Sequence, residues 1–356
     1  MEINNKNKDD IELLLDAISQ NPADEKNYEE LCKLYLAELK YREALDIYEA
    51  LLKVNPLNTS ALINAGSLNF YFKDINKAID YYSRASEIES KSFSIYMNLG
   101  NAYAEQGNFE QAMKNYSKAL ELESNSASLY NAIGLLYQDN KDYLSAIVNY
   151  DRAINIDAND TETYINKGSA QMSMHMYREA IKSFKKAAAI EPKNIKALIC
   201  IANCYASIRD FDNSYKYFEK CYKADSSVYQ VYVCHAIAYS DANETDLAID
   251  KYKEAIGINP DMPNAYILLG NIYVDKMMYL EALDCYKKAS QIQPYDSKTH
   301  TFIGNTYFML DDLTNAIYTY RNALKCNEYS LENKLVYIEI LQEYINRKES
   351  AKRAVS

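Results

Sequence analysis

The feature that most constrains this chain is a pattern that returns every 34 residues. The stretch at 96–121 reads YMNLGNAYAEQGNFEQAMKNYSKALE, and closely similar stretches begin at Tyr130 and Tyr266. From Tyr96 to Tyr130 is 34 residues, and from Tyr130 to Tyr266 is 136, which is four times 34. A fixed period of this length indicates an array of one repeated structural unit.

Three positions of the repeat carry the same kind of residue in all nine copies. Numbering the repeat from Phe93 places Gly100 at position 8, Ala112 at position 20 and Tyr116 at position 24. Position 20 is always Ala or Ser, and position 24 is always Tyr or Phe. No insertion interrupts this register over residues 25–330. Position 8 is small in every copy: Cys32, Gly66, Gly100, Gly134, Gly168, Ala202, Ala236, Gly270 and Gly304.

Apolar residues within each repeat follow the spacing of one face of a helix. Positions 4, 7, 8 and 11 fit this spacing, and positions 20, 24 and 27 fit it again after a short break. We therefore expect two amphipathic helices in each repeat, joined by a turn near positions 15 and 16, as at Gly107 and Asn108. Small residues at positions 8, 20 and 27 would let the two helices approach closely. Prolines near position 32 are expected to stop the second helix: Pro56, Pro192, Pro260 and Pro294.

This pattern resembles the tetratricopeptide repeat family, whose motif is W-x2-L-G-x2-Y…A-x3-F…P. The resemblance covers nearly the whole chain, with tyrosines such as Tyr96 and Tyr130 at position 4, where the family has tryptophan. It implies an all-α fold: a right-handed α-solenoid of about nine helix pairs with flanking terminal helices, in which each repeat stacks on its neighbours.

Both ends of the chain are expected to flank the array of residues 25–330. Residues 1–24 are predicted to form a tail and a lone second helix at Asp9–Gln20, because the register continues one unit upstream. Residues 331–356 are predicted to form a helix at Leu331–Asn346, which would cap the last apolar surface, followed by a frayed basic tail.

Composition narrows the possible partners and compartment. A net charge of −11 does not favour nucleic-acid binding. No run of 18 apolar residues predicts a membrane span. The N-terminal stretch lacks the basic start and apolar core of a signal peptide, and the seven cysteines show no disulfide-framework spacing. We therefore expect a cytoplasmic protein with reduced thiols.

The sequence carries none of the motifs sought for enzyme chemistry, so neither catalysis nor a cofactor is expected. It has no phosphate-binding glycine loop, GxSxG elbow, HExxH or CxxC pair. Cys200 and Cys204 lie four residues apart, with Cys234 and His235 one repeat later, and these are zinc-type ligands. They occupy positions 6, 10, 6 and 7, which point in different directions around a helix. Small buried cysteines are therefore favoured over a metal site.

Several polar residues occupy positions that are normally apolar. Lys167 and His235 are at position 7, Gln171 is at position 11 and His300 is at position 4. These side chains either reach a binding groove or extend to water from a loosened repeat. The second interpretation is favoured.

A row of asparagines is the main candidate site. The family resemblance implies that first helices line a concave groove, with positions 2, 5, 6, 9, 12 and 13 facing it. Asparagine fills 7 of the 18 slots at positions 6 and 9, and its amide both donates and accepts hydrogen bonds. Such a row could hold the backbone of an extended peptide, similar to the asparagine ladder of the O-linked N-acetylglucosamine transferases. With Asn131 displaced to position 5, the predicted groove residues are Asn64, Asn98, Asn101, Asn131, Asn166, Asn203, Asn271 and Asn305.

The charges at the groove positions indicate which peptides would fit. Position 5 carries no lysine, so the carboxylate clamp of chaperone-binding members of the family is not supported. Acidic residues at position 13 favour neutral-polar or basic segments. These residues are Glu105, Asp139, Asp241 and Asp275.

The sequence thus predicts a non-catalytic scaffold that binds extended peptide segments of partner proteins in its concave groove. Two alternatives stay open. One is a self-assembling scaffold, whose terminal helices or convex faces pair between copies. The other is an accessory subunit of a separately encoded glycosyltransferase. Nucleic acid and membrane are not expected as partners.

Overall fold

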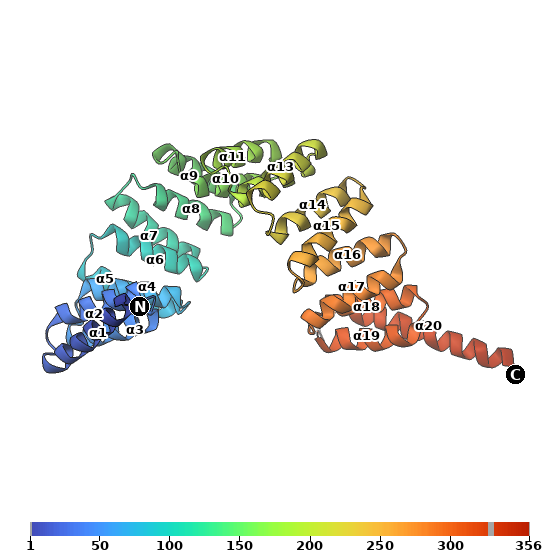
Figure 1. Ribbon diagram of the computed structural model, residues 1–356, viewed down its shortest axis with the longest axis horizontal. Coiled ribbons are helices and arrows are strands. Elements are labelled where there is room, and N and C mark those ends of the chain that lie inside the picture. The colour runs from blue at the N-terminus through green and yellow to red at the C-terminus, as the bar shows by residue number, and fades with distance from the viewer. Residues whose placement is uncertain (1, 327–330, 356) are drawn as a thin grey trace. The chain divides into compact units, whose positions relative to one another are not determined.

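The computed structural model describes residues 2–326 and 331–355, which form twenty α-helices and no strand (Figure 1). The all-α prediction is therefore confirmed. The chain divides into two compact units, residues 1–176 and residues 177–356. This division falls between the two helices of the fifth repeat, a boundary that the repeat register does not predict.

Each unit is a series of helix pairs joined by short turns. The first unit contains α1 (Glu2–Gln20), α2 (Glu25–Ala37), α3 (Tyr41–Val54), α4 (Thr59–Tyr71), α5 (Ile75–Ile88), α6 (Phe93–Glu105), α7 (Phe109–Leu122), α8 (Ala127–Asp139), α9 (Tyr143–Ile156) and α10 (Thr161–Ser173). The second unit contains α11 (Tyr177–Ile190), α12 (Ile195–Ser207), α13 (Phe211–Ala224), α14 (Tyr229–Asp241), α15 (Thr245–Ile258), α16 (Pro263–Asp275), α17 (Tyr279–Ile292), α18 (Ser297–Met309), α19 (Leu313–Cys326) and α20 (Leu331–Val355).

The terminal helices are longer than the sequence predicted. Helix α1 begins at Glu2 rather than Asp9, and α20 continues to Val355 rather than ending at Asn346. The predicted frayed tail is therefore helical as far as Val355. Its residues include good helix formers, and proline and glycine, the strongest helix breakers, do not occur in it.

The turn inside each repeat contains one residue in the left-handed backbone conformation. A backbone hydrogen bond from the next residue back to the first helix closes the turn. The backbone N–H at position 16 donates to the carbonyl at position 11, as from Asp74 to Asn69 at 2.9 Å. This is the bond that closes a helix in a Schellman motif. The residue at position 15 has φ between 58° and 77° in all nine repeats: Leu39, Lys73, Gly107, Lys141, His175, Arg209, Asn243, Met277 and Asp311. The predicted turn position is therefore confirmed.

The second helix of each repeat ends at position 30 with or without a following proline. Helix α3 ends at Val54 before Pro56, and α7 ends at Leu122 although Ser124 follows in place of a proline. In both, the next residue is extended, with φ of −128° and −144°. Proline therefore reinforces this helix end without determining it.

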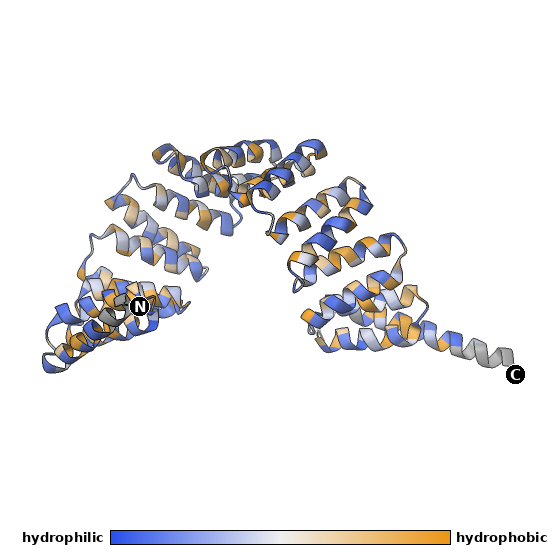
Figure 2. Ribbon diagram, viewed as in Figure 1, coloured by the Kyte–Doolittle hydropathy of each residue, from blue (hydrophilic) through white to orange (hydrophobic). Residues whose placement is uncertain are grey.

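A glycine and a tyrosine set the distance between the two helices of most repeats. A Cβ atom at Gly134 in α8 would lie 2.5 Å from the ring of Tyr150 in α9, which is fully buried. The same would occur at Gly100, at 2.3 Å from the ring of Tyr116. Since no real Cβ atom approaches a ring so closely, only glycine allows this packing. Apolar and polar residues alternate along the helices, as expected for amphipathic elements (Figure 2).

Candidate functional site

The asparagines at position 9 are oriented by the tyrosines at position 24 of the same repeat. The Tyr116 hydroxyl donates to Oδ1 of Asn101 at 2.8 Å. The Tyr286 hydroxyl donates to Oδ1 of Asn271 at 2.7 Å, and Tyr320 bonds Asn305 in the same way. With Oδ1 occupied, the Nδ2 group keeps its two N–H donors for another partner.

Other residues accept this hydrogen bond where position 9 is not asparagine. The Tyr82 hydroxyl donates to Ser67 at 3.0 Å, and the Tyr150 hydroxyl donates to Gln138 at 3.1 Å. In the sixth repeat position 24 is Phe218, which has no hydroxyl. There Asn203 instead makes a weak contact from Nδ2 to the sulfur of Cys234, at 4.0 Å. A structural need for an acceptor thus explains part of the asparagine enrichment.

The asparagines at positions 5 and 6 fall into two classes. Asn166 donates to Oδ1 of Asn131 at 3.1 Å, and Asn166 is buried. Asn64 and Asn98 are half-buried, and their side chains make no hydrogen bond to any residue that the structure describes. The second class therefore offers both a donor and an acceptor to a ligand.

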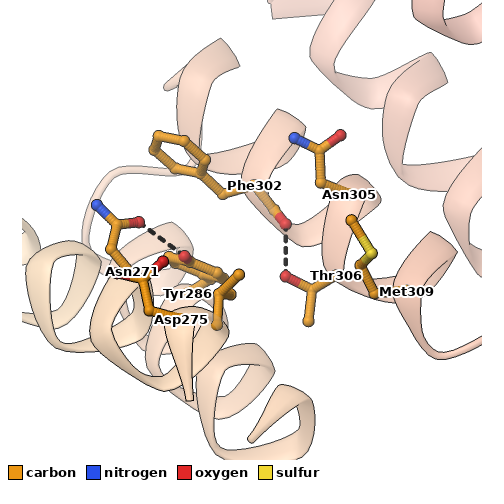
Figure 3. Close-up of a pocket in the computed structure, with 8 residues that line it drawn as sticks. Asn271, Asp275, Tyr286, Phe302, Asn305, Thr306 and Met309 are labelled. Carbon is orange, nitrogen blue, oxygen red and sulfur yellow. Dashed lines mark hydrogen bonds between the residues drawn. The ribbon is translucent and has the colours of Figure 1, made fainter. Parts of the chain in front are cut away.

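A pocket in the second unit brings two predicted asparagines together (Figure 3). Its volume is about 420 Å³, and its walls come from the first helices α16 and α18 and from one residue of α17. Most of the lining residues occupy the groove positions predicted from the sequence. The lining residues are Asn271, Val274, Asp275, Tyr286, Phe302, Asn305, Thr306 and Met309.

Two aromatic rings form an apolar part of this pocket. The ring of Tyr286 stacks on that of Phe302, with centroids 5.4 Å apart and an interplanar angle of 23°. The Thr306 hydroxyl donates to the backbone carbonyl of Phe302 at 2.7 Å, so its polar atom is satisfied within α18 (Figure 3). Met309 is 56% exposed at the end of α18. The pocket therefore has a rigid aromatic wall and a flexible thioether.

A carboxylate lies in the same pocket. Asp275 is exposed at the end of α16, and no ion pair joins it to a residue that the structure describes. Its neighbour Lys276 is held by Asp246 at 2.5 Å and does not neutralise it. Burial raises the pKa of the Tyr286 phenol, and the charges of Cys285 and Asp275 raise it further. Asp275 thus adds a negative charge to the lining of the pocket.

A second, smaller pocket surrounds Asn64 in the first unit. Its volume is about 220 Å³, and it lies on the first helices α2 and α4 with contributions from α3. It is more polar than the pocket of the second unit. Its lining residues are Glu29, Lys33, Tyr48, Leu51, Asn58, Ser60, Ala61 and Asn64.

Gln171 and His235, which are polar residues at normally apolar positions, do not extend to water. Lys167 does reach the surface, where it pairs with Asp151 at 2.5 Å, as the favoured interpretation required. Gln171 is buried, and His235 is 1% exposed, so that interpretation is wrong for both. His235 is held between the rings of Phe218 and Tyr239, with centroids 4.6 Å and 4.3 Å away.

The cysteines are free thiols in hydrophobic surroundings. All seven are unpaired. Burial raises the pKa of Cys200 to about 11 and that of Cys204 to about 12, so both are protonated at neutral pH. Within the described ranges, no three His, Cys, Asp or Glu side chains cluster as a metal site would require. None of the described helices is long and apolar enough to cross a membrane.

Comparison with known families identifies the repeat. A model described as "TPR repeat" matches residues 73–107, 100–141 and 238–276. A second, described as "Tetratricopeptide repeat", matches residues 127–160, 161–194, 195–227 and 263–296. The chain belongs to the tetratricopeptide repeat family. The four segments of the second model begin at the first position of a repeat in the register deduced from the sequence, and the predicted family is confirmed.

Several solved structures match this chain. Yeast Tom70 matches with a TM-score of 0.56 and 15% identity over 97% of this chain and 93% of that one, which supports the fold. MamA matches with a TM-score of 0.43 and 25% identity, over 48% of this chain and 94% of its own. YrrB, described as a TPR protein with an unusual peptide-binding site, matches with a TM-score of 0.43 and 21% identity over 52% and 95%. No curated protein sequence matches the chain.

Proposed function

We propose that this tetratricopeptide repeat protein is a non-catalytic scaffold whose first helices hold extended peptide segments of partner proteins. Proteins of this fold are typically scaffolds for protein interactions. The observation that carries the proposal is the hydrogen bond from Tyr286 to Asn271, with its counterparts at Asn101 and Asn305. It fixes each amide with Oδ1 occupied and leaves the two N–H groups of Nδ2 for a ligand.

Such amides suit the backbone of a peptide rather than a particular side chain. Each residue of an extended peptide presents a carbonyl oxygen, and Nδ2 is a donor for it. A hydrogen bond of this kind contributes about 0.5–1.5 kcal/mol net, and more if its loss leaves a buried group unpaired. Asn64 and Asn98, which have no protein partner among the described residues, would add both a donor and an acceptor.

The decisive experiment measures binding of a partner segment to groove variants. Partners are captured from the native cell, identified by mass spectrometry, and reduced to a labelled binding segment. We expect weaker binding of that segment, by tenfold or more, when four asparagines are replaced together by alanine: Asn64, Asn98, Asn101 and Asn166. Because Asn101 and Asn166 also bond to protein, the variant Asn64→Ala/Asn98→Ala separates binding from folding.

The control lies on the second helix of the third repeat. Lys114 is exposed on α7, and Lys114→Ala should not change binding. Lys118 is unsuitable as a neutral control, because its ammonium lies 4.8 Å from the centroid of the Tyr96 ring. If Lys114→Ala abolishes binding and the fourfold asparagine variant binds normally, the groove is not the binding site.

Self-assembly is a second candidate function, favoured by the apolar surface of α20. Leu335, Ile338 and Ile345 are each more than half exposed and are spaced by three and seven residues along one side of the helix. Such a row is typical of a surface that another helix covers. Light scattering tests this candidate. A dimeric or larger mass that Ile338→Glu reduces to that of one chain would support it.

A further inference from the structure

The pocket between α16 and α18 has the size and apolar wall of a site for one large side chain. Its volume of about 420 Å³ is in the range of small-ligand sites. Val274, Phe302 and Met309 contribute apolar surface from two consecutive repeats. Phe302 and Met309 are labelled in Figure 3. The exposed thioether of Met309 can adapt to side chains of different shape.

The charge around this pocket has one sign. Asp275 is the sole charged residue among those that line it, and its neighbour Lys276 is committed to Asp246. Asp241 occupies the same position of the preceding repeat and is also exposed. A cation bound here would therefore meet a carboxylate that no described lysine or arginine already neutralises.

The spacing on α16 fixes how far apart the two recognised groups would be. Asn271 and Asp275 are four residues apart, which is about one helical turn, or about 5.4 Å along the axis. An extended peptide rises about 3.3 Å per residue, so this distance corresponds to two peptide residues. An amide that grips the backbone at one residue thus places the carboxylate beside a side chain about two residues away.

We infer that this pocket is a specificity site for an extended peptide segment with a large aliphatic or aromatic side chain followed two residues later by lysine or arginine. The apolar side chain enters between Val274, Phe302 and Met309, and the cation lies against Asp275. The inference rests on the proposed function, because it assumes that Asn271 holds the peptide backbone at the apolar residue and that the segment runs along α16 toward Asp275. It adds a sequence preference that the asparagines alone do not supply.

The pocket around Asn64 offers an internal comparison. It contains Lys33 as well as Glu29, and its volume is about half that of the second-unit pocket. It therefore has less space for a large side chain. Its lysine would also repel a cation on the bound peptide. The preference should depend on the second unit alone.

The test uses the full chain and defined fluorescein-labelled peptides in fluorescence anisotropy. The first peptide is Ser-Ala-Ser-Leu-Ser-Lys-Ser-Ala-Ser, and two others replace Leu by Ala or Lys by Glu. Losing the leucine side chain should weaken binding about tenfold, since burying it removes most of its apolar surface from water. Replacing lysine by glutamate should weaken binding about threefold to tenfold, because the pair with Asp275 is partly exposed.

Two charge variants of the protein localise the effect. Asp275→Lys should reverse the preference, so that it binds the Glu peptide better than the Lys peptide. The matched control is Asp284→Lys, which makes the same charge change at an exposed residue of α17 outside the pocket lining. It should keep the preference for the Lys peptide. Circular dichroism checks that both variants are as helical as the wild type.

The outcomes separate this inference from the proposed function. Equal binding of all three peptides, or an Asp275→Lys variant that still prefers the Lys peptide, would show that the pocket is not a specificity site. Absence of binding of the first peptide at about 1 mM would also overturn the inference. The groove itself would then be judged by the asparagine variants and the captured partner segment, which do not depend on these peptides.

Discussion

Tyr286 donates a hydrogen bond of 2.7 Å to Oδ1 of Asn271, and this bond joins the packing of the repeat to its candidate binding surface. The ring of Tyr286 is buried against Gly270, where a Cβ atom would lie 2.6 Å from it. The residue that sets the helix spacing thus also orients the asparagine. We therefore expect a substitution at position 9 to change both folding and the proposed binding, and a useful variant must separate them.

Asn305 allows folding and binding to be separated by an Asn305→Asp variant. The residue one turn further along its helix is Met309 rather than an acid, so the new carboxylate has no like charge at that place. Asn305→Ala leaves the hydroxyl of the buried Tyr320 without its acceptor, which should cost about 1–3 kcal/mol of unfolding free energy. Asn305→Asp keeps an acceptor oxygen and should cost less, while it removes the N–H donors that we propose bind peptide. Urea unfolding and anisotropy measure the two effects. Equal stability of the two variants would mean that the tyrosine bond contributes little.

Glycine should be essential for close packing in the repeats where it occupies position 8 against a tyrosine. Gly134→Ala places a Cβ atom 2.5 Å from the ring of Tyr150 and should destabilise the protein by about 1–3 kcal/mol. The control is Gly257→Ala in α15, where a Cβ atom meets nothing within 4 Å. It should stabilise by about 0.5–1 kcal/mol, because alanine is the better helix former. Thermal melts of both variants check the prediction. A Gly134→Ala protein that melts like wild type would contradict the packing argument.

The sequence predicted the packing positions well because they repeat. Nine copies of a small residue and an aromatic, 16 residues apart, determine the helix pair regardless of the exact side chains. The link from Tyr286 to Asn271 escaped prediction, because a hydroxyl and an amide 15 residues apart carry no periodic hydrophobic signal. One sign was nevertheless present: Asn203 is the only asparagine at position 9 whose repeat has phenylalanine at position 24.

Features that occur once were not predicted. The burial of His235 depends on Tyr215, Phe218 and Tyr239 around it, and their side-chain packing cannot be deduced from a polar residue at position 7. The division after Met176 also leaves no mark in the register. The pocket of the second unit is lined by Phe302 at position 6, where no other repeat has an aromatic residue, so the repeat pattern does not predict it.

The left-handed turn at position 15 gives a prediction for backbone strain. Lys141 has φ of 63°, and L residues other than Asn and Asp rarely adopt this conformation. Gly107→Ala should destabilise by about 1 kcal/mol, since its φ is 77° and no atom lies within 4 Å of the new Cβ to compensate. Lys141→Gly should be neutral or slightly stabilising, because relief of strain offsets the entropy that glycine gains on unfolding. Chemical denaturation compares the two. A stabilising Gly107→Ala would refute the strain argument.

His235 should make stability fall as the pH falls below neutrality. Its imidazole is buried between Phe218 and Tyr239, and its Nδ1 bonds the Tyr222 hydroxyl at 2.8 Å. Burial, aided by the charge of Lys251, lowers the pKa of His235 from its ordinary 6.5 to about 3. Between these two values the unfolded chain binds a proton that the folded chain does not. The stabilisation is therefore complete above pH 6.5 and is lost as the pH falls toward 3, at up to about 1.4 kcal/mol per pH unit.

Comparing variants isolates this effect from the carboxylates, which also titrate in acid. His235→Phe keeps an aromatic ring between Phe218 and Tyr239 but removes the titrating group, so its stability should fall less steeply from pH 6.5 to pH 4 than that of wild type. Tyr222→Phe removes the hydroxyl that bonds Nδ1 and keeps the imidazole. Its free energy of unfolding should therefore be lower at every pH, but should fall with pH as steeply as that of wild type. Urea unfolding at half-unit pH steps gives the three slopes. If His235→Phe follows the wild-type slope, the imidazole of the folded protein is already protonated near pH 6, and the aromatic enclosure does not keep it neutral.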